Sequence, residues 1–128
     1  MRTPRGFGVL ALAGTLALVG CESGPKGPGN LTGTVSGGTA LGAVTLEVVG
    51  PGIQGFGGLG DTRAYGALVS QRDQRHRVVL VHPSGGTFQF TIAVSDRGAR
   101  TPSIDVLAAA GTDNRTISPA GIVVSIQP

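Results

Sequence analysis

The 128-residue sequence predicts an all-β fold, a single antiparallel β-sandwich, on three observations. First, apolar and polar residues alternate in several short segments after residue 30, as they do in strands that bury one face. Second, no segment in this region shows a clear apolar stripe with helical spacing. Third, turn sequences rich in glycine, proline, asparagine and aspartate separate the alternating segments.

Three segments, 43–49, 86–95 and 121–127, alternate most clearly and are predicted to be strands. Their expected inward residues are Val44, Leu46, Val48, Phe88, Phe90, Ile92, Val94, Ile122, Val124 and Ile126. Weaker patterns predict four further strands at 31–35, 65–70, 77–82 and 103–109. Residues 104–110 also fit a helix, because their alanines favour helical backbone.

About seven short strands with frequent turns are typical of an immunoglobulin-like sandwich. A small closed barrel is the alternative architecture. A barrel that crosses a membrane is not expected, because the strands are too few and several are too short.

The N-terminal residues 1–20 have the three parts of an export signal. Arg2 and Arg5 supply the positive charge that stays on the cytoplasmic side. Residues 7–19 form an uncharged apolar run of 13 residues, whereas a helix that crosses a bilayer needs about 20. A cleaved signal is therefore favoured over a permanent transmembrane anchor, and the small Gly20 ends the segment.

Residues 18–21, Leu-Val-Gly-Cys, resemble the lipobox of bacterial lipoproteins. The resemblance implies that the thiol of Cys21 receives a diacylglyceryl group and that a peptidase cuts between Gly20 and Cys21. Two or three acyl chains at this terminus would anchor the protein stably, whereas a single chain binds a membrane only weakly. Glu22 takes the place of the aspartate that retains many lipoproteins in the inner membrane, which favours the outer membrane.

An ordinary buried cysteine is the alternative for Cys21, but its position directly after the apolar run favours lipidation. The expected organisation is a lipoprotein signal peptide at 1–20, a lipidated cysteine and Gly/Pro-rich linker at 21–30, and the β-sandwich at 31–128. Because the chain has no second cysteine, it forms no intramolecular disulfide, and the domain must be held by packing alone.

Two predicted strands are similar to those of cohesin-type sandwich domains. Residues 41–48, LGAVTLEV, resemble the opening amphipathic strand of that family, and residues 86–92, GTFQFTI, resemble a later strand. The chain is shorter than a full cohesin and lacks its usual polar loops in the first half. The resemblance therefore implies a sandwich fold, and dockerin binding is not carried over.

The formal net charge of +3 arises mostly in the signal, because Arg2 and Arg5 are two of the ten basic residues. The chain after Cys21 has eight basic and seven acidic residues. No nucleic-acid partner is expected from this near balance, and no aromatic residues alternate with the basic ones to stack on bases.

Residues 55–60, GFGGLG, match the G-x-G-x-x-G pattern of dinucleotide-binding turns. Such a turn must lie between a strand and a helix, and no helical pattern follows residue 60. The segment is instead predicted to be a Gly-rich loop or a bulged edge strand. No cofactor is expected.

Arg72, Arg75 and Arg77 form the densest basic cluster and are the candidate contact for an anionic partner. On one strand Arg75 and Arg77 would share a face at roughly 7 Å, and the planar guanidinium binds oxyanions with two hydrogen bonds. Asp73 lies within the cluster, so a solvated loop is the alternative interpretation.

Metal binding is not predicted. His76 and His82 would lie about 20 Å apart along one straight strand, too far for a shared ion. No further cysteine or histidine completes a zinc site. Asp96, Asp105 and Asp113 lack the spacing of a calcium-binding EF-hand loop.

The preferred functional hypothesis is an exported protein, anchored by lipid to the bacterial envelope, whose sandwich is a non-catalytic binding or structural module. Its expected partners are the membrane, through the lipid, and an envelope protein or anionic polymer. The alternative is a small envelope hydrolase in which Ser84, His76 and Asp73 assemble in space, although the sequence contains no G-x-S-x-G nucleophile motif.

Overall fold

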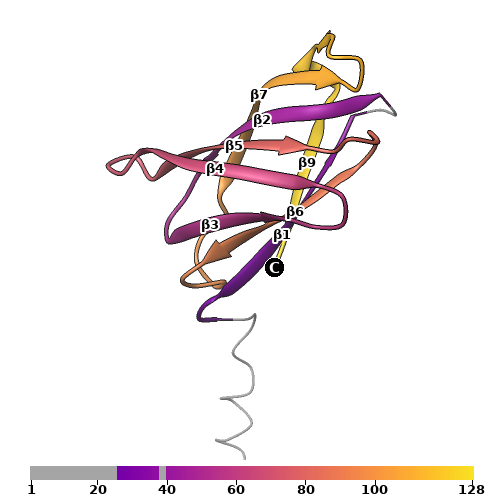
Figure 1. Cartoon of the computed structure of the whole chain (residues 1–128). Coiled ribbons are helices and arrows are strands. Elements are labelled where there is room, and N and C mark those ends of the chain that lie inside the picture. The colour runs from indigo at the N-terminus through magenta and orange to yellow at the C-terminus, as the bar shows by residue number, and fades with distance from the viewer. Residues whose placement is uncertain (1–25, 38–39) are drawn as a thin grey trace, which may run out of the picture.

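The structure is a computed structural model that describes residues 26–37 and 40–128. Within these residues the chain forms nine strands and one short 3₁₀ helix (Figure 1). Their bounds are β1 Gly29–Ser36, β2 Leu41–Val49, β3 Ile53–Gly58, β4 Arg63–Ser70, β5 Arg75–Val81, β6 Phe88–Val94, β7 Ser103–Gly111, β8 Thr116–Ile117, η2 Pro119–Gly121 and β9 Val123–Gln127.

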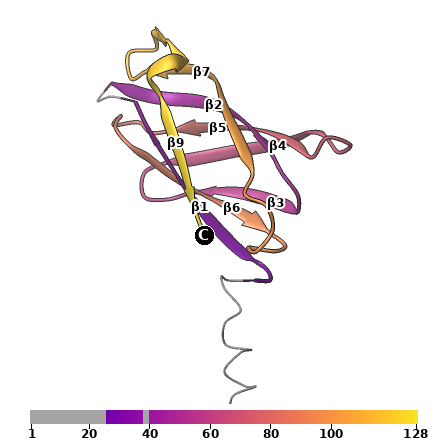
Figure 2. The ribbon, with the colours of Figure 1, turned by 180° about the vertical axis from the view of Figure 1, so that it is seen from behind.

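The strands form two sheets in which every pair is antiparallel. One sheet has the order β3-β6-β1-β9, and the other has the order β4-β5-β2-β7-β8. Figures 1 and 2 show the two layers crossing at an angle, with the chain entering at the start of β1. Because each sheet ends in two edge strands, the antiparallel sandwich is confirmed and the closed barrel is excluded.

The core lies between the sheets and includes the inward side chains that the alternation predicted on β2 and β6, together with Leu31, Val35, Leu41, Val78, Leu80 and Ala109. Phe88, Phe90 and Ile92 on β6 are fully buried, and Val44, Leu46 and Val48 face them from β2. Val124 and Ile126 on β9 are half-buried against this core. Burial of each large apolar side chain stabilises the fold by about 1.5–3 kcal/mol, so these strands define the packing.

The structure resolves two alternatives that the sequence analysis left open, adds one short strand and begins the first strand earlier. β3 is a strand within the Gly-rich segment, at the edge of its sheet and with a register shift between Ile53 and Gly55. This confirms the bulged edge strand and not the loop. The two-residue β8 was not predicted, and β7 is a strand with no helix. β1 begins at Gly29, so the expected boundary at residue 31 lies inside a strand.

The sheets are joined on one side by β3 and β4, which follow each other in the chain but belong to different sheets. Their backbones lie close together near the connecting turn, where a Cβ on Gly58 would clash with the carbonyl oxygen of Thr62. Farther along, Gly66 of β4 leaves room for the ring of Phe56 on β3. Figure 1 shows the two strands separating beyond this point.

One end of the sandwich is held together by contacts between several turns. The N–H of Gly27 donates to Oδ1 of Asp96 (3.0 Å), and the N–H of Arg97 donates to the carbonyl of Gly27 (2.9 Å). The N–H of Ser95 donates to the carbonyl of Gly52 (2.9 Å). The N–H of Gly50 in turn donates to the carbonyl of Gln74 (3.2 Å). We call this region the N-terminal end, because the described chain enters the sandwich there. It comprises the chain before β1, the β2–β3 and β4–β5 turns, the β6–β7 loop and the adjoining ends of the strands.

Candidate functional site

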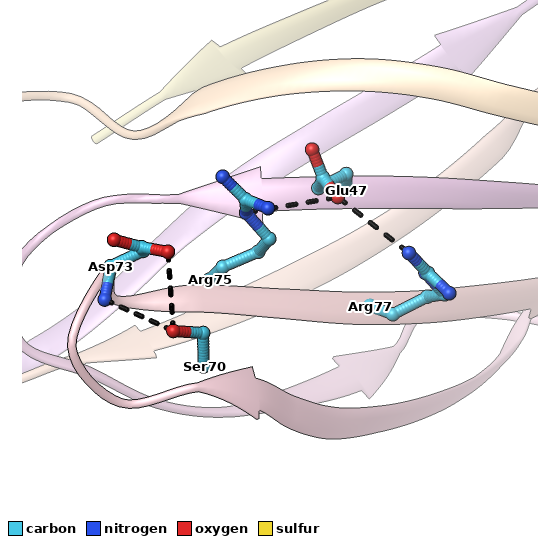
Figure 3. A network of polar contacts seen from close by, with 5 residues as sticks. All are labelled: Glu47, Ser70, Asp73, Arg75 and Arg77. Carbon is cyan, nitrogen blue, oxygen red and sulfur yellow. Dashed lines mark hydrogen bonds and ion pairs between the residues drawn. The ribbon is translucent and has the colours of Figure 1, made fainter.

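Arg75 and Arg77 lie on the outer face of β5 and converge on Glu47 of β2 (Figure 3). Nε of Arg75 is 3.8 Å from Oε2 of Glu47, and Nη2 of Arg77 is 3.7 Å from the same oxygen. The two guanidinium side chains are 41% and 49% exposed, whereas the Glu47 side chain is 19% exposed. The predicted shared face of the arginines is therefore confirmed, and their two charges share one carboxylate.

Arg72 is exposed in the turn that joins β4 to β5, so it belongs to the same corner of the molecule. Asp73 is engaged within that turn, where its N–H donates to Oγ of Ser70 and its Oδ2 accepts from the same hydroxyl (both 3.3 Å). Gln74 adopts a positive φ of 55° as the turn closes. The basic cluster thus spans the turn and the start of β5. Glu47 also belongs to it, and the sequence analysis missed this residue because it lies 28 residues before Arg75.

The outer face of this sheet has a charged row beside an apolar one. In register, Arg77 is paired with Glu47, and Glu47 with Asp105 of β7. The next outward-facing row, farther from the β4–β5 turn, holds Tyr65 and Val79, which are 60% and 36% exposed. Opposite charges in neighbouring strands stabilise a sheet modestly, so the charged row does not by itself require a ligand.

His76 has the opposite orientation from its neighbours and faces the interior between the sheets, where its ring meets Phe56 edge-on at 5.6 Å. Its Nδ1 is buried without a hydrogen-bond partner. Burial lowers the pKa of His76 below 6.5, because a desolvated imidazole holds its proton less well.

Two hollows adjoin His76 where β3 and β4 separate, and Leu68 lines both. One measures about 380 Å³ and is bordered by Gly50, Gly52, Ile53, Gln71 and Gln74. The other measures about 500 Å³ and is bordered by Gln54, Gly55, Phe56, Gly66 and Ala67. Of the side chains that line them, His76 is the titratable one. The sequence analysis did not predict these hollows beside His76, because the segment 50–58 shows no alternation.

His82 lies just beyond the other end of β5, with its ring stacked on Phe88 at 5.6 Å. The two histidines thus occupy opposite ends of one strand, as the sequence predicted. Ser84 follows His82 in the next turn, whereas Asp73 lies in the turn before His76. The structure therefore does not bring Ser84, His76 and Asp73 together as a catalytic set.

The carboxylate of Asp96 is held by two backbone groups. Its Oδ1 accepts hydrogen bonds from the N–H of Gly98 (2.9 Å) and the N–H of Gly27 (3.0 Å). These two bonds lower the pKa of Asp96 below 3.8, with a smaller contribution from Lys26. Asp96, Asp105 and Asp113 do not meet, and within residues 26–37 and 40–128 no three His, Cys, Asp or Glu side chains gather as a metal site would require.

Gly20 and Cys21, the predicted cleavage and lipidation residues, lie outside the described residues. In the part of the chain that the structure describes, no helix has the length and apolar character needed to span a bilayer. No family model, curated protein or solved structure matches the chain. The resemblances to lipoproteins and to cohesin-type domains therefore remain predictions.

Proposed function

We propose that this chain is a bacterial envelope lipoprotein, anchored through Cys21, whose β-sandwich works by binding or support and not by catalysis. The observation that carries the proposal is the Leu-Val-Gly-Cys sequence at 18–21, which directly follows a charged start and a short apolar run.

The spacing between the cysteine and the sandwich supports this proposal. β1 begins at Gly29, eight residues after Cys21. A fully extended chain of that length reaches at most about 29 Å, at 3.3–3.6 Å per residue. A lipid at Cys21 would therefore keep the sandwich close to the membrane surface, within reach of other envelope components.

Metabolic labelling with a palmitate analogue tests the anchor. We expect the wild-type protein to be labelled and processed, and Cys21→Ser to be unlabelled and to accumulate as a precursor, because a serine hydroxyl does not replace the thiol as the lipid acceptor. Gel fluorescence gives the label, and mass spectrometry of the purified protein gives the N-terminus.

Ser23→Ala is the matched control, since it changes a neighbouring side chain and leaves the cysteine in place. It should be labelled and processed like the wild type. Equal labelling of Cys21→Ser and the wild type would overturn the lipoprotein proposal.

A further inference from the structure

The basic residues of the described chain are concentrated at the N-terminal end. Six of the eight lie there, in the chain before β1, the β4–β5 turn, the start of β5 and the β6–β7 loop: Lys26, Arg72, Arg75, Arg77, Arg97 and Arg100. Four acidic residues lie at the same end: Glu47, Asp73, Asp96 and Asp105. The opposite end has Arg63 and Arg115 balanced by Asp61 and Asp113. All of the excess positive charge therefore lies where the chain enters the sandwich.

Three of the four acids at the N-terminal end are engaged by groups of the protein itself, whereas Asp105 is exposed on β7 beside Glu47 in register. Glu47 is shared by Arg75 and Arg77, Asp73 accepts from the Ser70 hydroxyl, and Asp96 accepts from two backbone N–H groups. Arg72 and Arg100 are exposed in loops.

The loops that carry these charges are tied to one another. The hydrogen bonds from Gly27 to Asp96, from Ser95 to Gly52 and from Gly50 to Gln74 connect the entering chain, the β6–β7 loop and the β4–β5 turn. Pro102 also lies against the backbone of Gly50, where an added Cβ would be 2.9 Å from its Cα. The basic groups are therefore presented by a connected end of the sandwich and not by independent loops.

We propose that this N-terminal end docks on the anionic headgroups of the membrane that holds the lipid anchor. The inference rests on the proposed lipidation of Cys21, which brings this end within about 29 Å of the bilayer. Arginine suits the role, because its guanidinium forms paired hydrogen bonds with phosphate oxygens. A lipid anchor and a basic surface together hold a protein on a membrane better than either does alone.

The test measures the binding of the lipid-free chain 22–128, which contains all nine described strands, to sedimented vesicles. The vesicles contain phosphatidylglycerol and phosphatidylethanolamine, or neutral phosphatidylcholine alone. We expect binding to the anionic vesicles at low salt and its loss at high salt, because ions screen exposed charges. Neutral vesicles should bind little at either salt concentration.

Two double variants remove the same charge from opposite ends. Arg72→Gln with Arg100→Gln should weaken binding about thirtyfold, since each basic residue near an anionic surface contributes about 1 kcal/mol and the variant removes two. Arg63→Gln with Arg115→Gln should bind nearly as the wild type does. All four arginines are exposed, and circular dichroism with a denaturant midpoint checks that each variant is folded.

Equal loss in both double variants would show that net charge alone acts, and would overturn the proposed orientation. Equal sedimentation with anionic and neutral vesicles would overturn the docking surface itself. Neither result depends on an acyl chain attached to the protein, so the labelling of Cys21 is tested separately.

Discussion

At the scale of single residues, two glycines make room for aromatic rings across strands. Gly33 on β1 is paired directly with Phe90 on β6, and a Cβ at Gly33 would lie 2.4 Å from the Phe90 ring. Gly66 on β4 likewise makes room for Phe56 on β3 of the other sheet, because a Cβ at Gly66 would lie 2.5 Å from the nearest ring atom. These glycines are required by close packing and not by an unusual backbone conformation, because neither has a positive φ.

Gly33→Ala should destabilise the domain by about 1–3 kcal/mol, since an extra methyl group in a packed core forces side chains from their preferred positions. The buried Phe90 ring has no solvent to move into. Urea denaturation followed by circular dichroism measures the change.

Gly55→Ala is the control for that substitution, because a Cβ at Gly55 would meet nothing within 4 Å. It should leave the midpoint unchanged or raise it slightly, as alanine reduces the freedom of the unfolded chain. A Gly33→Ala variant as stable as Gly55→Ala would show that the space at Phe90 is larger than described.

At the scale of elements, the side of the sandwich formed by β3 and β4 depends on few contacts. Within the described residues β3 is paired with β6 alone. The ring of Phe56 on β3 reaches across to His76 on β5 of the other sheet. The aromatic pair therefore connects the two sheets beside the hollows that border His76. Protonation of this imidazole would place a charge where its Nδ1 has no partner.

Stability should consequently fall when the pH is lowered from 8 to 5.5. The pKa of His76 is below 6.5 in the folded protein. Above pH 6.5 its imidazole is therefore neutral in both the folded and the unfolded protein, and burying the ring costs no stability through its charge. As the pH falls through 6.5 the unfolded chain takes up a proton that the folded protein resists, which favours unfolding. Urea midpoints across this range give the slope.

His76→Gln should flatten that pH dependence, whereas His82→Gln should retain the part that comes from His76. The lowered pKa of Asp96 acts only below about pH 4, near its unperturbed value, and so does not enter this range. An identical slope in the wild type and in His76→Gln would refute the assignment.

At the scale of the whole molecule, the entering chain is part of the domain and not only a spacer. Gly27 exchanges hydrogen bonds with the β6–β7 loop, and Gly29 is already paired with Val94. The sequence placed the boundary at residue 31, because a Gly/Pro-rich composition resembles a linker even where its backbone is hydrogen-bonded.

A chain that begins at Lys26 should therefore be more stable than one that begins at Leu31. We expect a difference of about 1–3 kcal/mol, since each lost intramolecular hydrogen bond contributes about 0.5–1.5 kcal/mol. Thermal and urea denaturation of the two purified proteins measure it. Equal denaturation midpoints for the chains that begin at Lys26 and at Leu31 would show that residues 26–30 contribute nothing to stability.

The sequence by itself determined the all-β class, the inward faces of β2 and β6, and the predicted lipid anchor at Cys21. Alternation and the lipobox-like sequence at 18–21 are local patterns, which a few neighbouring residues are enough to form. Only the tertiary structure decided that the Gly-rich segment forms β3, that Glu47 faces Arg75 and Arg77, and that His76 lies between the sheets. It also brought Lys26, Arg72 and Arg100 to one end. These relations join residues far apart in the chain, and pairing between strands fixes them, which no local pattern encodes.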